Sequence, residues 1–215
     1  DVNANEEAAK YITDQVKDNE EALQGARDIM AEWIAENETA RNAVRKIFTE
    51  SAIFSSRVLT TKKDEEDAQK YRDYFEFKEP LANCPSHRIM AIRRGEKEGF
   101  LIMDINIEKE SSIDELKRKF ITVHNEASQQ VGLAIEDSFS RLLKPSIETE
   151  FRILSKTKAD EEAIKVFAEN LRQLLLASPL GHKRIMALDP GFRSGCKVVC
   201  LDEQGTFLKY ITIFP

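Results

Sequence analysis

The longest uninterrupted helical pattern in this chain lies between Pro145 and Pro179. Residues 146–177 include neither glycine nor proline. In the second half of this stretch, apolar side chains recur every three or four residues, as along one face of an α-helix: Ala163, Ile164, Phe167, Leu171, Leu174 and Leu175. Pro145 suits the first turn of a helix, and Pro179 with Gly181 ends one. The pattern predicts one long helix near 146–177 and, with it, a mainly α fold.

Shorter helical patterns precede this segment. Asp18 and Glu21 have the spacing of a capping box. After Asp18, apolar residues form one stripe that we expect to face the core: Ala22, Ala26, Ile29, Met30, Trp33 and Ile34. Further helices are predicted at 38–50, at 64–75 and around 131–142.

The periodicity changes between residues 88 and 107. The runs 88–93 and 100–107 are rich in Ile and Met and have the length of strands. Between them lie Gly95 and Gly99, which suit a turn. The pattern predicts a small β-hairpin near 88–107.

The end of the chain has the pattern of a β-meander. Three strand-like runs, 184–189, 195–201 and 206–213, are separated by Pro190-Gly191 and Gln204-Gly205. A three-stranded sheet of this kind has two open edges, so we expect self-association through residues 184–213. We therefore predict a helical scaffold with an inserted hairpin over 1–183 and the first strands of a second domain over 184–215.

Composition narrows the functional class. The 215 residues have a formal net charge of −6, which argues against a protein whose whole surface binds nucleic acid. Bases are nevertheless concentrated in 41–63, where we expect either a solvated helix face or a local basic patch. No stretch has the length of a membrane span, the first ten residues lack the basic-then-apolar pattern of a signal peptide, and we expect the three cysteines to form no disulfide framework. A cytoplasmic protein without a membrane partner is expected.

Asp189 is the strongest single candidate for a catalytic or metal-binding residue. It ends a predicted strand and is followed by a glycine-containing turn, 190–195. A carboxylate in this position can reach a divalent metal, as at the start of ribonuclease-H-like nucleases and of sugar-kinase and actin-like ATPases. Metal-dependent phosphoryl transfer needs further carboxylates, and the sequence identifies none. A hydrogen-bonded strand-end Asp is the simpler interpretation, and no catalytic residue, metal or cofactor is predicted.

Basic residues provide candidates for phosphate contact. They lie around the predicted hairpin and on the outward face of the helix at 38–50: His87, Arg88, Arg93, Arg94, Lys97, Arg41 and Arg45. Such side chains contact phosphates in many nucleic-acid-binding proteins. The alternative is that they hold neighbouring helices together. The three histidines have no zinc-site spacing, and no P-loop, GxSxG or HExxH motif is present.

Four stretches, in this order, resemble the Tex family of bacterial transcription accessory proteins. They are 21–32 (EALQGARDIMAE), 85–88 (PSHR) with the glycines at 95 and 99, 161–177 (EEAIKVFAENLRQLLLA), and 188–197 (LDPGFRSGCK). The family is related to a eukaryotic transcription elongation factor. Each stretch is weak alone, but the ordered set runs nearly end to end.

The resemblance implies a helical scaffold with a long central helix, followed by a YqgF-type, ribonuclease-H-like domain that lacks a full nuclease carboxylate set. Further helix-hairpin-helix repeats and an RNA-binding OB-fold domain follow in the family. By that pattern, this chain is a fragment that covers the central helical region and the start of the YqgF-like domain. Asp189 would then be a vestigial carboxylate.

Three functional hypotheses follow from these patterns. The first is a non-catalytic scaffold segment of a nucleic-acid-binding transcription factor, whose partners are RNA or DNA and the transcription machinery. The second is a metal-dependent nuclease or resolvase that uses Asp189. The third is a scaffold for protein interactions alone, based on the long helix and the alternating charge blocks.

Overall fold

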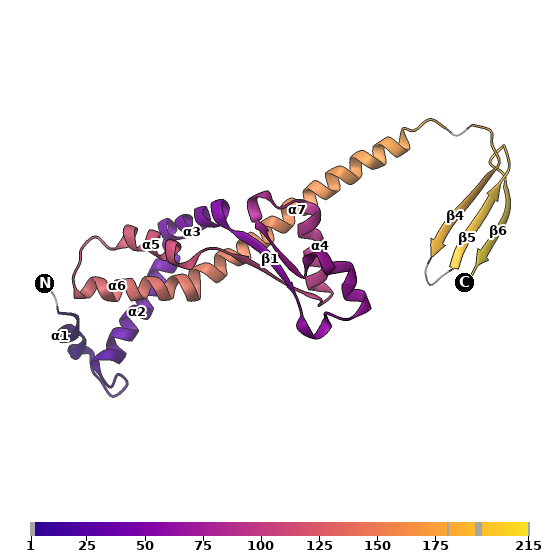
Figure 1. The fold of residues 1–215 in the computed structure, drawn as a ribbon. Coiled ribbons are helices and arrows are strands. Elements are labelled where there is room, and N and C mark those ends of the chain that lie inside the picture. The colour runs from indigo at the N-terminus through magenta and orange to yellow at the C-terminus, as the bar shows by residue number, and fades with distance from the viewer. Residues whose placement is uncertain (1–2, 180, 192–194, 215) are drawn as a thin grey trace. The chain divides into compact units, whose positions relative to one another are not determined.

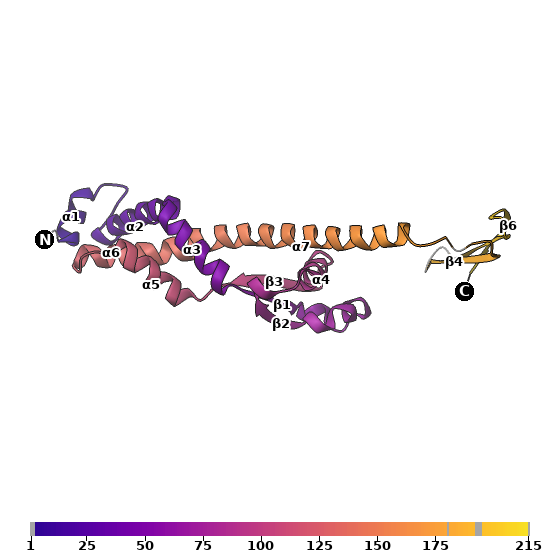
Figure 2. The same ribbon diagram turned by 90° about the horizontal axis from the view of Figure 1, so that it is seen from above.

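The computed structural model describes residues 3–179, 181–191 and 195–214 (Figures 1 and 2). Contacts divide the chain into two units, Asp1–Lys165 and Val166–Pro215, and the division falls within the longest helix. The first unit is mainly helical and contains one small sheet, whereas the second contains the end of that helix and a separate sheet.

The elements of the first unit follow one another with short connections. The helices are α1 (Ala4–Ala8), α2 (Asn19–Glu36), α3 (Glu38–Ser51), α4 (Ser86–Lys97), α5 (Lys109–Phe120), α6 (Glu126–Asp137) and α7 (Lys144–Leu175), of which residues 166–175 belong to the second unit. The strands are β1 (Ile53–Val58), β2 (Glu76–Pro80) and β3 (Leu101–Asn106). Short 3₁₀ segments occupy Ala9–Tyr11, Thr60–Lys62, Glu66–Tyr74 and Leu81–Asn83.

The predicted long helix is confirmed as α7. It continues from α6 through a π-helical segment, Ser138–Leu143, so residues 126–175 are helical throughout. Pro145 therefore marks a change of helix type and not a break. Because proline has no N–H and its ring crowds the carbonyl four residues earlier, a wider turn just before it relieves the conflict.

Capping explains where α2 and α3 begin. Asp18 Oδ1 accepts a hydrogen bond from the Glu21 N–H at 2.9 Å, as the predicted capping box requires. The Glu21 carboxylate, however, accepts from the N–H of Lys17 and not from that of Asp18. Asn37 caps α3 through the Ala40 N–H at 3.1 Å, and α3 confirms the helix predicted at 38–50.

The predicted hairpin at 88–107 is wrong in its first half. Residues 88–93 belong to α4, in which Ile89 and Ile92 are buried three positions apart on one helix face. Gly99 has a φ of 77° and ends this helix, because its N–H and that of Phe100 bond back to carbonyls of the last turn. The glycines that suggested a hairpin turn therefore serve a helix.

The second half of that prediction, β3, is a strand with a different partner. It pairs antiparallel with β1, with Leu101 opposite Val58 and Asn106 opposite Ile53. The sheet order is β2-β1-β3, and neither β1 nor β2 was predicted. The segment predicted as a helix at 64–75 forms a 3₁₀ segment that buries Ala68 and Tyr71.

One hydrophobic core joins these elements. Its fully buried side chains come from both the helices and the sheet: Val44, Phe48, Phe54, Ile92, Leu101, Met103, Ile105, Leu116, Ile135, Phe139, Leu143 and Ile147. Trp33 was expected there but is 69% exposed, and Ile29 is 52% exposed. The stripe on α2 is thus divided, because Ile34 and Ala31 face the core while Ile29 and Trp33 face outward.

The second unit confirms the predicted β-meander. Strands β4 (Ile185–Gly191), β5 (Gly195–Leu201) and β6 (Phe207–Ile213) are antiparallel in the order β4-β5-β6. Asp202 builds the second turn by accepting hydrogen bonds from the Gln204 and Thr206 N–H groups, at 2.9 and 2.8 Å. These bonds lower the pKa of its carboxyl, as expected for an Asp of a turn.

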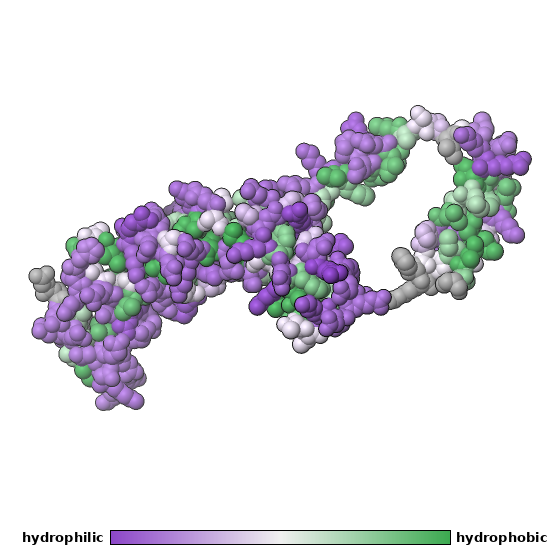
Figure 3. Space-filling model, viewed as in Figure 1, coloured by the Kyte–Doolittle hydropathy of each residue, from purple (hydrophilic) through white to green (hydrophobic). Residues whose placement is uncertain are grey.

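Both faces of this sheet carry apolar side chains. The register aligns Leu188, Val198 and Ile211 on one face. It aligns Ala187, Val199 and Tyr210 on the other. The space-filling view shows hydrophobic surface gathered over these strands (Figure 3). Among the described residues, no helix is both long and apolar enough to span a membrane.

Candidate nucleic-acid interface

The structure separates six of the seven predicted basic candidates into two groups and leaves His87 outside both. The first group is engaged in contacts that hold the fold together. The Nη atoms of Arg41 bond the Ser146 hydroxyl at 3.1 Å and the Ala35 carbonyl at 3.3 Å. Arg45 Nε donates to the Glu150 carboxylate at 2.9 Å. Both arginines therefore join α3 to α7.

Arg88 also belongs to this group. Its Nη1 donates to Glu79 Oε2 at 2.9 Å, which ties α4 to β2. His87 is exposed at the start of α4 and has no hydrogen-bond partner in the described part of the chain. For Arg88, the structure favours the role of holding neighbouring elements together, whereas His87 makes no such contact among the described residues.

The second group lies on α4 beside α7. A groove of about 670 Å³, which we call the α4–α7 groove, is lined by four basic side chains: Arg93, Arg94, Lys97 and Lys156. Three acids also line it: Glu96, Glu98 and Asp160. Met90 and Ala159 provide apolar surface between them. Three of the seven predicted candidates therefore meet in one place.

The acids of this groove are already paired. Glu96 binds Arg152 at 3.1 Å, and Glu98 binds Lys70 at 2.7 Å. Asp160 is paired with Lys156, one turn earlier on α7. The hydrogen bond from Lys70 lowers the pKa of the Glu98 carboxyl and raises the pKa of the Lys70 ammonium, as in a formed ion pair.

Three of the bases, in contrast, have no acidic partner in the described residues. Arg94 and Lys97 are exposed in the last turn of α4, where positive charge also suits the negative end of the helix dipole. Arg93 is half-buried and donates from Nη1 to the Arg152 carbonyl at 3.1 Å. Burial lowers the pKa of Arg93, but a guanidinium keeps its charge in proteins. The groove therefore presents three cations that form no ion pair with the described residues.

Two residues of this arrangement were missed in the sequence. Lys156 lines the groove from α7, and Lys70 neutralises Glu98 from the 3₁₀ segment before β2. Their positions depend on the packing of α4 against α7 and against the small sheet. No local pattern in the sequence indicates that packing, so helical periodicity alone could not have identified them.

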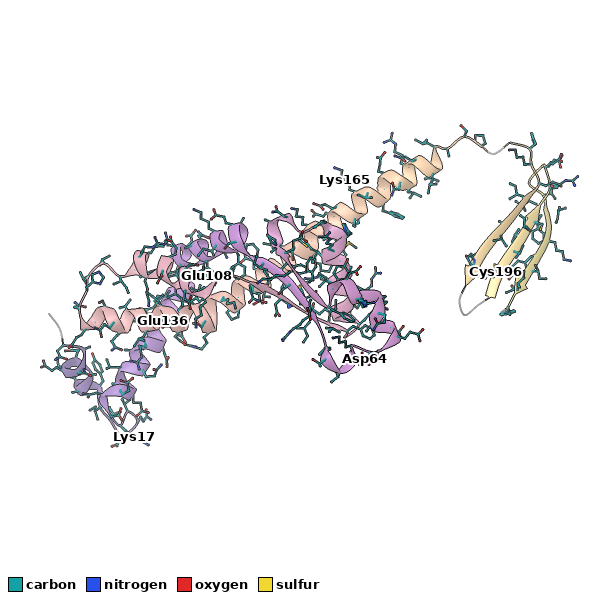
Figure 4. The ribbon with its side chains drawn as sticks, in the orientation of Figure 1. Lys17, Asp64, Glu108, Glu136, Lys165 and Cys196 are labelled. Atoms are coloured by element: carbon teal, nitrogen blue, oxygen red, sulfur yellow. The ribbon has the colours of Figure 1, made fainter. Side chains whose placement is uncertain are left out.

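Asp189 lies near the end of β4 and is exposed. The register sets it opposite Lys197 on β5, a neighbour that disfavours metal binding through its positive charge. Within the described residues, no three side chains of the His, Cys, Asp and Glu types come together in a way that could hold a metal ion. Cys196 (Figure 4) and Cys200, on β5, are free thiols, as is Cys84.

Comparison with known proteins gives a consistent picture. A family model described as Tex central region-like matches residues 1–167, and one described as Tex protein YqgF-like domain matches 183–215. Protein tex of Bordetella pertussis is 34% identical over 97% of this chain and 28% of its own length. Transcriptional accessory protein Tex of Neisseria gonorrhoeae is 31% identical over 96% of this chain and 28% of its own.

A human relative extends the comparison. S1 RNA-binding domain-containing protein 1 of Homo sapiens is 31% identical over 88% of this chain and 20% of its own length. The chain thus spans less than a third of the length of these curated relatives.

Proposed function

The chain belongs to the Tex family, and from this premise we propose that it is a non-catalytic scaffold segment of a nucleic-acid-binding transcription accessory protein. The names of two relatives support the proposal, since one is called a transcriptional accessory protein and another contains an S1 RNA-binding domain. The observation that carries it is the α4–α7 groove, in which Arg93, Arg94 and Lys97 lack acidic partners among the described residues.

These three cations suit contact with a phosphate backbone. Arg94 and Lys97 are three residues apart on α4, so their side chains emerge from the same helix face. Guanidinium and ammonium groups bind phosphates without reading sequence, and this contact positions a protein on RNA or DNA. We therefore propose a role in holding nucleic acid, in the cytoplasm and together with the transcription machinery, and no bond-breaking step.

A scaffold for protein interactions alone is the second candidate. On α7, Ile164, Phe167 and Leu174 are each more than 60% exposed, and both faces of the β4–β6 sheet are apolar. Surfaces of this kind mark sites of interaction. We propose that residues 184–213 also mediate self-association through their open strand edges. The nuclease alternative has weaker support, because Asp189 faces Lys197 across the strands.

Binding of labelled single-stranded RNA and duplex DNA across a salt series tests the proposal. For duplex DNA, each phosphate contact contributes about −0.9 to the slope of log affinity against log salt. Replacing Arg94 and Lys97 together by Gln should therefore make the slope about 1.8 less negative. Co-purification with polymerase that survives nuclease treatment would favour the protein-interaction scaffold instead.

A matched control separates the groove from general charge. Lys17, in the loop before α2 (Figure 4), and Lys109, at the start of α5, are exposed and have no ion pair in the described residues. The double variant Lys17→Gln and Lys109→Gln removes the same charge elsewhere on the first unit. If it weakens binding as much as the groove variant does, or if the chain binds neither probe at low salt, the assignment of phosphate contact to this groove is wrong.

A further inference from the structure

We propose that Arg152 is a positioning residue of the α4–α7 groove, which keeps Arg93 available to a phosphate by holding Glu96 away from it. The inference rests on the proposed function and assigns a role to a side chain that is not itself among the groove's lining residues.

Arg152 binds three elements at once. Its Nη1 donates to Glu96 Oε1 on α4 at 3.1 Å, and its Nε lies 3.5 Å from Glu148 Oε1 on α7. Its Nη2 donates to the Met103 carbonyl on β3. The planar guanidinium suits this task because it spreads five N–H donors over three nitrogen atoms, whereas a lysine ammonium has three on a single nitrogen.

Glu96 would otherwise be the natural partner of Arg93. The two side chains are three residues apart on α4, the spacing at which opposite charges on a helix pair. In the structure Arg93 donates instead to the main-chain carbonyl of Arg152. Burial lowers the pKa of Arg93 and repulsion from Arg152 acts in the same direction, while attraction to Glu96 and, more weakly, to Asp160 opposes them. Asp160 is itself paired with Lys156. Arg93, Arg152 and Glu96 thus interact, and Arg152 takes the Glu96 carboxylate.

Loss of the Arg152 guanidinium should redirect Glu96. Its side chain is only 33% exposed, so an unpaired carboxylate there is poorly solvated and will pair with the nearest cation. We expect that partner to be Arg93, which already attracts Glu96, and its neutralisation would remove one phosphate contact. The slope for duplex DNA should become about 0.9 less negative, and affinity at 0.1 M salt should fall roughly eightfold.

The test compares Arg152→Gln, Arg93→Gln, Glu96→Gln and the double variant Arg152→Gln with Glu96→Gln, using one labelled DNA duplex and a salt series. We expect Arg152→Gln to match Arg93→Gln in slope, and the double variant to return to the wild-type slope because residue 96 no longer carries the charge that would pair with Arg93. A purely structural role of Arg152 predicts no such rescue. A wild-type slope for Arg152→Gln, or a double variant as weak as the single one, overturns the proposal.

Glu96→Gln alone keeps the proposal testable if Arg152→Gln fails to fold. It removes only the carboxylate, so affinity should equal or exceed that of the wild type, and weaker binding overturns the proposal. Arg141→Gln is the matched control, because Arg141 binds Asp137 in a pair outside the groove, and its slope should stay unchanged. If the wild type does not bind, or if Arg93→Gln leaves the slope unaltered, the proposed phosphate contact in the groove is wrong. If Arg93→Gln changes the slope and Arg152→Gln does not, only the role inferred for Arg152 is wrong.

Discussion

Replacing glycine by alanine at two sites, Gly95 on α4 and Gly25 on α2, tests how closely α4 packs against the sheet. A Cβ atom added at Gly95 would lie 2.6 Å from Leu101 Cδ1 and 3.2 Å from Tyr71 Cδ1. A Cβ atom added at Gly25, on α2, meets nothing within 4 Å. The same substitution, Gly to Ala, should therefore change stability in opposite directions at the two sites.

The magnitudes follow from these distances. Both sites are helical, so alanine gains about 1 kcal/mol in helix propensity at each. At Gly95 the methyl group must displace Leu101, which is only 2% exposed, by about 0.8 Å to reach ordinary contact. Overpacking of this kind costs about 1–3 kcal/mol. Gly25→Ala should stabilise the first unit by up to about 1 kcal/mol, and Gly95→Ala should destabilise it by about 0–2 kcal/mol.

Urea unfolding followed by circular dichroism measures both changes, with the slope of the transition checking that the unfolded state is unaltered. Thermal midpoints should shift by about 2–4 °C for each kcal/mol. If Gly95→Ala stabilises the protein as much as Gly25→Ala, α4 does not approach β3 as closely as the structure indicates.

Three further results are expected. Asp18→Ala removes the cap of α2 and should cost about 1 kcal/mol in urea unfolding, whereas Asp14→Ala in the preceding loop should cost little; equal effects would contradict the capping role. Burial raises the pKa of the Cys84 thiol to about 12, so mass spectrometry after alkylation at pH 8 should show it modified more slowly than Cys196. Above about pH 9 the folded state keeps the Cys84 proton while the unfolded state loses it. The free energy of unfolding should therefore decrease as the pH rises above about 9. Sedimentation velocity should show concentration-dependent association that Ile211→Lys on β6 weakens, and a chain that stays monomeric at every concentration would refute association through 184–213.

Patterns that repeat within a few residues predicted the structure well. The long helix α7, the capped start of α2, the helix α3 and the C-terminal meander all follow from local spacing, from the cap at Asp18 and from turn residues. The error at 88–93 arose because a short run with Ile89 and Ile92 suits a buried helix face as well as a strand. In the structure, Gly95 lies so close to Leu101 that a Cβ atom has no room, and local spacing does not show this tertiary contact.

Counting charged residues along the sequence likewise failed to locate the candidate site. Counting bases along the chain singled out 41–63 as the candidate basic patch. In the structure, however, Arg41 and Arg45 form hydrogen bonds to Ser146 and Glu150 on α7. The groove lies instead in 81–183, where acids and bases balance in number. Its lining has four bases and three acids. Three of those bases stay without an ion pair because Arg152, Lys70 and Lys156 each pair with one of the acids.

The local potential of such a groove is therefore set by the partners that folding assigns to each acid, and not by the composition of the segment. Glu96 is the decisive case, since it lies within reach of both Arg93 and Arg152 and can neutralise only one of them fully. If that choice sets the phosphate affinity, a mildly acidic chain can bind a polyanion without any excess of basic residues. The rescue of Arg152→Gln by Glu96→Gln measures this directly, because it restores binding while removing one base and one acid, with no change in net charge.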